Sequence, residues 1–281
     1  MSKKVIAAIV AAAAVGFGAR RLQNYLMGKG RLADYIRSED SPLETAVRVF
    51  GNSGQEIHLA GAIHLAEQGY FDAMRQRLDS LDLVLYEAVK ASPGSTPDYL
   101  ALLRRAYKVG AAQLGLAYQM EAIDYEHLPL NWEHCDLSEQ EMAASSKGLL
   151  YNQAFTSSAL YKELIRSFEE QLDDAEQSLG QLAPGSTQKV RSLAGKQMVR
   201  MLTSRLAEKV HMLPLDALLG KGVILEKRNA KVTGRLDELI AAGTPGNIGV
   251  FYGAAHLPGI EDHLKEKGFS LSRTEWQEAW S

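Results

Sequence analysis

Two stretches of the sequence share one pattern, an apolar strand-like run that leads through Gly-x-x-His towards a helix. The first run ends in Gly61-Ala-Ile-His64 and the second in Gly253-Ala-Ala-His256. Glycine lets the chain turn sharply off a strand, so each histidine is expected just above the carboxyl end of its strand. Open α/β sheets bind ligands at that edge. The repeated pattern therefore indicates an α/β sheet with two histidines at its ligand-binding edge.

The intervening residues alternate between strand and helix patterns. β-branched runs on either side of Gly51–Gly54 predict a hairpin, and a helix over 67–81 followed by a buried strand over 82–87 predicts a β-α-β unit. Further elements are expected as helices over 98–116 and 223–242, extended pieces over 121–124 and 132–135, and a last strand over 269–273. We expect an α/β (α+β mixed) fold, a central mixed sheet flanked by helices.

The sequence between about 138 and 213 has a different pattern, long amphipathic helices interrupted by Ala183-Pro-Gly-Ser186. This predicts a helical hairpin inserted into a single α/β domain that spans 40–281. The hairpin could act as a lid over the sheet.

Residues 1–32 have the composition of a targeting or anchor segment. Lys3 and Lys4 precede an apolar run to Ala19, and Arg20 and Arg21 follow it. A helix of fifteen residues measures about 22 Å, short of the roughly 30 Å hydrocarbon core. We expect a membrane-associated or exported protein, and the N-terminal segment is the part that would attach it to a membrane. An Ala-rich helix packed on the domain, and with it a cytoplasmic location, is the alternative.

The net charge and the cysteine content limit which binding partners and which metal ligands the chain can have. A net charge of −3 gives no basic field for a polyanion, so nucleic acid is not expected. The single cysteine, Cys135, excludes an internal disulfide framework and a Cys-rich zinc site. Gly-x-Ser-x-Gly, phosphate-loop and His-Glu-x-x-His motifs are absent from the sequence. Metal ligands must therefore be histidines and carboxylates.

Glu87 ends the strand predicted over 82–87 and should reach the same edge as His64 and His256 if the strands are parallel neighbours. A buried carboxylate must be paired, hydrogen-bonded or metal-bound. Two imidazoles and one carboxylate suit a divalent ion of the manganese, cobalt or zinc type with a position open for water. The simpler alternatives are a salt bridge from Glu87 to Arg228 and histidines that only cap or pack.

The motif blocks resemble the TraB/GumN/Tiki family. His58-Leu-Ala-Gly61-Ala-Ile-His64 with Leu83-Val-Leu-Tyr-Glu87 is similar to its first block, and Gly249 to Gly259 to its last. Lys227-Arg228-Asn229 resembles its Arg-Asn helix start. The first turn lacks the threonine common in the family, having Ala62 in its place.

This resemblance implies a metal-dependent hydrolase, with protease activity proposed for the Tiki branch and haem- or iron-associated proteins among related folds. It implies His64, Glu87 and His256 as metal ligands or acid/base groups, and Arg228 as a holder of a carboxylate, phosphate or oxyanion. The supporting residues it implies, or that adjoin the site, are Asn229, Asp136, Tyr86, Gly61 and Gly253. For Asp136 a plain helix N-cap is the alternative, and for Tyr86 core packing.

We therefore expect a metal-dependent hydrolase that acts on peptide or amide bonds, with a peptide or small molecule as substrate. A binding protein that holds haem, iron or a signalling peptide in the same cleft is the second hypothesis. A membrane-attached regulatory protein is the third.

Overall fold

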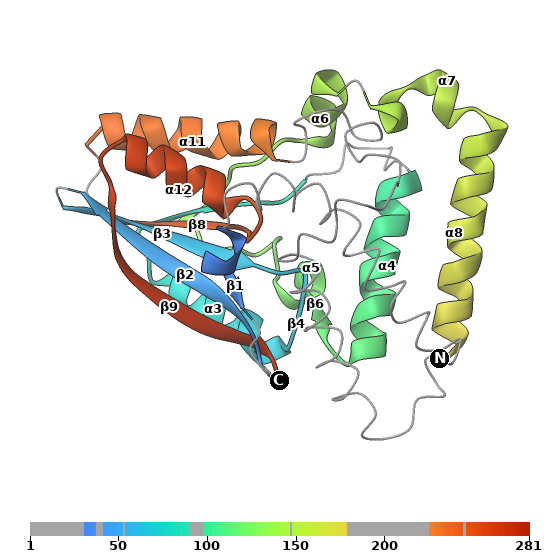
Figure 1. Ribbon diagram of the computed structural model, residues 1–281, viewed down its shortest axis with the longest axis horizontal. Helices are drawn as coiled ribbons and strands as arrows, with labels where there is room; N and C mark the ends of the chain where they lie inside the picture. Colours follow the sequence, from blue (N-terminus) through green and yellow to red (C-terminus); the bar gives the residue numbers. More distant parts are fainter. Residues whose placement is uncertain are drawn as a thin grey trace.

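The computed structural model describes residues 31–37, 42–52, 54–89, 98–146, 148–178, 225–243 and 246–281 (Figure 1). Their main sheet has seven strands. In spatial order the first six are β1 (Ile36–Arg37), β2 (Leu43–Asn52), β3 (Gln55–Ala62), β8 (Gly246–Gly253), β5 (Leu83–Tyr86) and β7 (Trp132–His134). The seventh, β9 (Ser270–Trp280), pairs with β2. A second, two-stranded sheet joins β4 (Leu65–Ala66) to β6 (Ala117–Tyr118).

The sheet is mixed, as the sequence predicts. Strand β2 runs antiparallel to β1, β3 and β9, whereas β3, β8, β5 and β7 are mutually parallel. The predicted hairpin is β2–β3, and the predicted β-α-β unit is β3–α3–β5. Strand β8, from the far end of the chain, lies between β3 and β5, which brings the two Gly-x-x-His turns to neighbouring strands.

The described residues also form helices and two short 3-10 segments, η1 (Leu32–Asp34) and η2 (Leu149–Tyr151). The helices are α3 (Gln68–Asp79), α4 (Asp98–Leu114), α5 (Gln119–Ala122), α6 (Glu139–Ser145), α7 (Gln153–Thr156), α8 (Ala159–Ser178), α11 (Glu226–Ala241) and α12 (Leu257–Glu266). Gly243 and Gly268 follow α11 and α12 with φ of 62° and 85°, the left-handed conformation that glycine supplies at helix ends.

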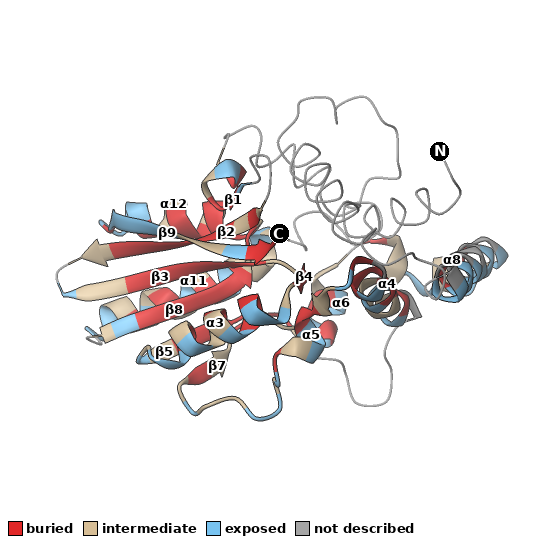
Figure 2. Ribbon diagram, turned by 90° about the horizontal axis from the view of Figure 1, so that it is seen from below, coloured by how far each residue is buried: buried red, intermediate tan, exposed pale blue. Residues whose placement is uncertain are grey.

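Helices cover both faces of the main sheet, and alternate strand residues supply the two cores (Figure 2). On one side Leu236 of α11 and Ile260 of α12 meet Leu59 and Val250. On the other side Phe71, Met74 and Leu78 of α3 meet Ala60, Val84 and Phe251. Because strand side chains point alternately to opposite faces, a strand buried on both faces carries the continuous apolar run seen in β8.

Two local predictions are wrong. The stretch predicted as extended over 121–124 includes part of α5, where the N–H of Ile123 donates to the carbonyl of Gln119 and closes a helical turn. Within the helix predicted over 98–116, an inward-facing position is expected for Leu102, Leu103 and Ala106, but Leu103 is 36% exposed, whereas Leu102 and Ala106 are buried. Helix α4 buries a narrow stripe against Leu172 of α8, and position 103 falls beside that stripe.

The described part of the predicted helical insertion comprises α6, η2, α7 and α8. Helix α8 packs on α4, to one side of the sheet and its covering helices (Figures 1 and 2). Residues 179–213, including the second arm of the predicted hairpin, lie outside the described residues, as do residues 1–30 of the predicted anchor. None of the helices within the described ranges has the length and apolarity needed to cross a bilayer.

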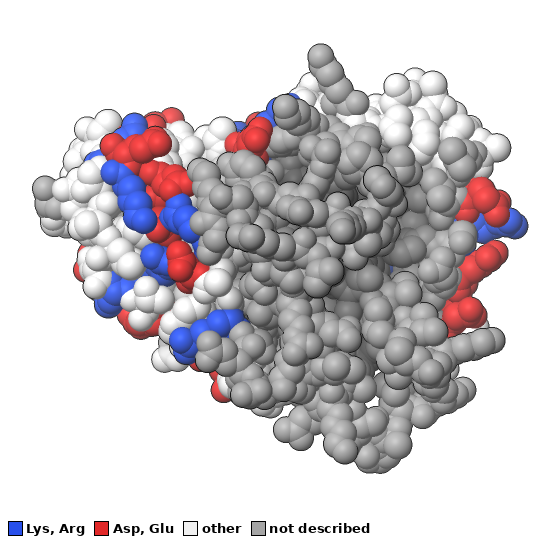
Figure 3. All heavy atoms as spheres, in the orientation of Figure 1, with Lys and Arg blue, Asp and Glu red and all other residues white. Residues whose placement is uncertain are grey.

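The charges of the described surface are mixed in sign. On the face shown in Figure 3, basic and acidic side chains lie next to one another. Residues on α11 also form ion pairs with their surroundings, such as Arg235–Glu133 at 2.8 Å and Lys267–Asp237 at 2.9 Å.

Candidate functional site

The topology brings the three predicted site residues to one edge of the sheet. The N–H of Ala254 donates to the carbonyl of Ala62 at 2.9 Å, so the two Gly-x-x-His turns are hydrogen-bonded to each other. The N–H of Glu87 donates to the carbonyl of Phe251 at 3.0 Å, which fixes the residue after β5 against β8. The expectation of parallel neighbouring strands is confirmed.

The Glu87 side chain lies at the end of β8 and has two strong partners. Its Oε2 accepts the N–H of Gly253, and its Oε1 accepts Nη2 of Arg228 at 2.5 Å. Burial alone would raise the pKa of Glu87, but Arg228 first, then His256 and His64, hold this pKa well below its usual range. Glu87 is therefore a carboxylate at neutral pH, and the salt bridge to Arg228 considered from the sequence is present.

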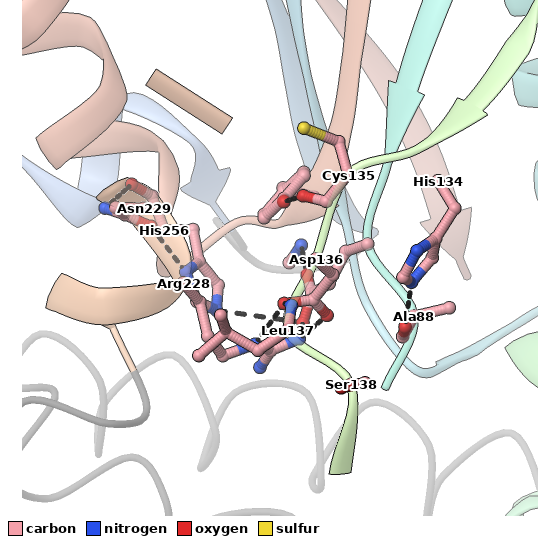
Figure 4. Close-up of polar contacts among 12 residues, drawn as sticks. Ala88, His134, Cys135, Asp136, Leu137, Ser138, Arg228, Asn229 and His256 are labelled. Carbon is pink, nitrogen blue, oxygen red and sulfur yellow. Dashed lines mark hydrogen bonds and ion pairs between the residues drawn. The ribbon is translucent and has the colours of Figure 1, made fainter. Parts of the chain in front are cut away.

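Arg228 holds a second carboxylate, that of Asp136 (Figure 4). Its Nε donates to Oδ1 at 2.8 Å and its Nη2 to Oδ2 at 2.5 Å, the two-point geometry that a guanidinium makes with a carboxylate. Asp136 has a fully buried side chain, and its Oδ1 also accepts the N–H of Leu137. The N-cap of α6 is Ser138, whose side chain forms a capping box with Glu141, so the N-cap alternative for Asp136 is wrong.

His256 begins α12 and is held by Asn229 of α11 (Figure 4). Its ring Nδ1 lies 2.6 Å from Oδ1 of Asn229, whose Nδ2 donates to the carbonyl of His256 at 3.0 Å. An amide oxygen only accepts, so Nδ1 carries the proton and Nε2 keeps its lone pair. This Nε2 lies 3.7 Å from Oε1 of Glu87. Burial lowers the pKa of His256 to about 4 against the opposing charge of Glu87, so the ring is neutral.

His64 is held in the same manner from another part of the chain. Its Nδ1 lies 3.1 Å from Oε1 of Gln119, and its carbonyl accepts the N–H of Gln119 at 2.9 Å. The ring of Tyr107 lies on the imidazole, with centroids 4.8 Å apart. Burial lowers the pKa of His64, although Glu87 and Gln119 oppose this shift. His64 is thus also neutral with Nε2 as its lone-pair nitrogen.

The glycines near the site make room for its polar groups. A Cβ on Gly253 would lie 3.2 Å from Oε2 of Glu87, and one on Gly61 would lie 3.2 Å from the carbonyl of Ala46. A Cβ on Gly259 would come within 2.7 Å of Nδ2 of Asn229. Side chains at positions 253 and 259 would therefore displace Glu87 and Asn229.

Tyr86 is buried, and its ring packs against the rings of Trp132, Tyr125 and His134. These ring contacts favour the packing role considered for it. Three further histidines have partners elsewhere, namely His127 with Asp124, His134 with the carbonyl of Ala88 and His263 with Asp237. His58 is buried in the sheet and is 3.5 Å from Glu56, and His211 lies outside the described residues.

Sequence reasoning missed Gln119 and Tyr107, which contact His64 from α5 and α4. Neither belongs to a motif, and Gln119 is 55 residues from its partner. The pairing of β4 with β6, which joins Leu65 to Tyr118, and the hydrogen bonds between Gln119 and His64 bring the two segments together.

The donor types at the site, imidazole nitrogen and carboxylate oxygen, are ones that bind divalent metal ions. Two neutral imidazoles offer Nε2 lone pairs, and Glu87 retains lone pairs beyond the two that accept hydrogen bonds. Donors sharing one ion at bond lengths of about 2.1 Å lie roughly 3.0–3.5 Å apart, close to the 3.7 Å between His256 and Glu87. Across the described ranges, no group of three or more His, Cys, Asp or Glu side chains has an arrangement that could hold a metal ion. His256 and Glu87 are thus two donor residues close enough to share an ion, and a metal site would need a third donor beside them.

Comparison with known families adds a finding from the C-terminal half. Residues 153–273 match the model of the TraB/PrgY/gumN family. This part of the chain is similar to the TraB/PrgY/gumN family. The matched span contains Arg228, Asn229, Gly253 and His256, and the TraB resemblance drawn from the motif blocks is confirmed.

The matched span begins after His64 and Glu87. Searches among curated proteins and among solved structures returned no match. A functional role for these two residues therefore stays a prediction from their motifs and from their position at the sheet edge.

Proposed function

We propose that this protein is a metal-dependent hydrolase that acts on peptide or amide bonds, with His64, Glu87 and His256 as the metal ligands. One observation carries the proposal. Both histidines have Nδ1 tied to an amide oxygen, so both have a neutral Nε2 lone pair, and that of His256 lies 3.7 Å from the ionised Glu87. Orientation of a ligating imidazole through its other nitrogen is the usual support of metal-binding histidines.

A divalent ion of the manganese, cobalt or zinc type would, when bound, acidify a water molecule and polarise a substrate carbonyl. The residues of the chain do the rest. Glu87, kept ionised by Arg228, serves either as a ligand of the ion or as the general base that accepts the proton released from the attacking water. Gly253 and Arg228 fix the direction of that carboxylate through two hydrogen bonds. The neutral rings of His64 and His256 have no proton on Nε2 to compete with the ion.

In this proposal Arg228 mainly binds other side chains of the protein rather than the substrate. Its Nε and Nη2 are engaged by Asp136 and Glu87, so its principal effect is to hold Glu87 charged and in place. The contact with a substrate carboxylate, phosphate or oxyanion remains a prediction for this residue.

The test is hydrolysis of a peptide library by full-length protein supplied with Mn²⁺ or Co²⁺. We expect metal-dependent turnover that is lost in Glu87→Gln and kept in Glu163→Gln, a glutamate that is 62% exposed on α8. Glu87→Gln keeps the shape of the side chain and an acceptor for Gly253, so a loss of turnover reports on charge. Equal activity of wild type and Glu87→Gln would contradict the proposed role.

Binding without turnover is the second candidate, and one observation favours it. The Arg228 guanidinium already neutralises Glu87 at 2.5 Å, which weakens a general base. In that case the site would hold haem, iron or a signalling peptide. Stoichiometric binding of Co²⁺ or haem by a protein that cleaves no peptide in the library would favour this function.

A further inference from the structure

Gln119 is the residue near the site for which motif and topology give no role, although its contacts are extensive. It is 5% exposed, and it touches His64 twice, through its side-chain oxygen and its backbone N–H. Its amide nitrogen donates to the hydroxyl of Tyr125 at 2.9 Å. The hydroxyl thus fixes the direction of the amide, with Oε1 turned towards the imidazole.

Asn229 makes the equivalent pair of contacts with His256. In both cases one amide residue accepts from the ring Nδ1 and donates to the carbonyl of the same histidine. The supports come from unrelated elements, α5 for His64 and α11 for His256. The same type of support thus occurs at both histidines of the site.

We propose that Gln119 is the positioning residue of His64: its Oε1 fixes the Nδ1–H tautomer, so that Nε2 carries the lone pair used by the site. The use of this lone pair as a metal ligand rests on the proposed function. Which ring nitrogen of His64 carries the proton can be tested without it. A neutral ring without such an acceptor distributes its proton between both nitrogens, and only one form has a free Nε2.

The experiment is long-range ¹H–¹⁵N correlation NMR of metal-free, histidine-labelled full-length protein. The His64 signals are those absent from His64→Gln. We expect wild type to show a protonated Nδ1 and an unprotonated Nε2. Gln119→Met, which keeps the length of the side chain and removes the acceptor, should shift His64 towards the Nε2–H form. Gln119→Glu, which keeps an acceptor oxygen, should restore the wild-type tautomer.

The control is Gln177→Met, because Gln177 is an exposed glutamine on α8. It should leave the His64 signals unchanged. An Nε2–H tautomer of His64 in the wild type would by itself overturn the inference. The test therefore remains possible even if Gln119→Met does not fold. An unchanged tautomer in folded Gln119→Met overturns the inference as well.

A second readout separates this inference from the proposed function. Co²⁺ affinity of Gln119→Met, measured by titration with the metal alone, should fall about 10–100-fold, whereas Gln119→Glu should stay near wild type. If wild type binds no Co²⁺ but the tautomer shifts as expected, the hydrolase proposal fails and the role of Gln119 stands. If wild type and Gln119→Met bind Co²⁺ equally and the His64 tautomer is the same in both, the role of Gln119 fails and the metal site of the hydrolase proposal stands.

Discussion

Replacing Arg228 by Met should strongly destabilise the protein, because it leaves two carboxylates buried without their counter-charge. The side chains of Glu87 and Asp136 are 12% and 0% exposed, and Arg228 lies 2.5 Å from each. Opposite charges at that distance attract by about 7 kcal/mol at an effective dielectric constant of about 20. Desolvation offsets much of this attraction, and deletion of one partner of a buried pair typically costs about 3–5 kcal/mol. We expect a loss of that size in the free energy of unfolding at neutral pH.

The assay is urea unfolding of full-length wild type and Arg228→Met at several pH values. Because Arg228 lowers the pKa of Glu87, its contribution is present above the unfolded value near 4.5 and is lost as the pH falls. The difference between the two proteins should therefore shrink in acid. Arg166→Met is the matched control, since the Arg166–Glu163 pair at 2.7 Å is 63% and 62% exposed, and it should change little. A loss below about 1 kcal/mol in Arg228→Met, or a difference that does not depend on pH, would refute the reasoning.

Three further predictions concern single positions. Between pH 6.5 and about 4 the wild type should lose up to about 3 kcal/mol relative to His256→Gln, because the unfolded imidazole takes up a proton that the buried ring does not; parallel pH profiles of the unfolding free energy would contradict this. Gly259→Ala should push Asn229 away from His256 and weaken Co²⁺ binding about tenfold in titrations, and unchanged affinity would show that the contact is dispensable. Ser138→Ala should cost about 1 kcal/mol in thermal unfolding through loss of the α6 capping box, whereas an unchanged midpoint would exclude that contribution.

Much of the fold follows from local patterns, and so does the edge at which the site lies. The continuous apolar run of β8 and the alternation of β2 and β3 identify their strands, and the glycines after α11 and α12 mark helix ends. The position of β8 between β3 and β5 is not encoded locally, because strand order depends on packing between distant segments. The local signal also failed for α5, a single helical turn too short to show periodicity.

The site likewise contains residues that the sequence identifies and contacts that it does not. His64, Glu87 and His256 could be found because each follows a strand at a fixed offset, and Arg228 and Asn229 through their place in a motif. The pairing of Arg228 with both Glu87 and Asp136 joins residues 141 and 92 positions apart, which only the folded chain reveals. Gln119 has no sequence signature, since a glutamine at the start of a short helix is unremarkable until its partner is known.

The most direct test of the account is the metal content of full-length protein purified without a His-tag and measured by plasma mass spectrometry. We predict about one divalent ion per chain in the wild type and in His127→Ala, a histidine that is 79% exposed, and its loss in His64→Ala, Glu87→Ala and His256→Ala. Wild-type protein that holds no metal, and gains none on incubation with Mn²⁺, Co²⁺ or Zn²⁺, would contradict the assignment of these three residues to one metal site.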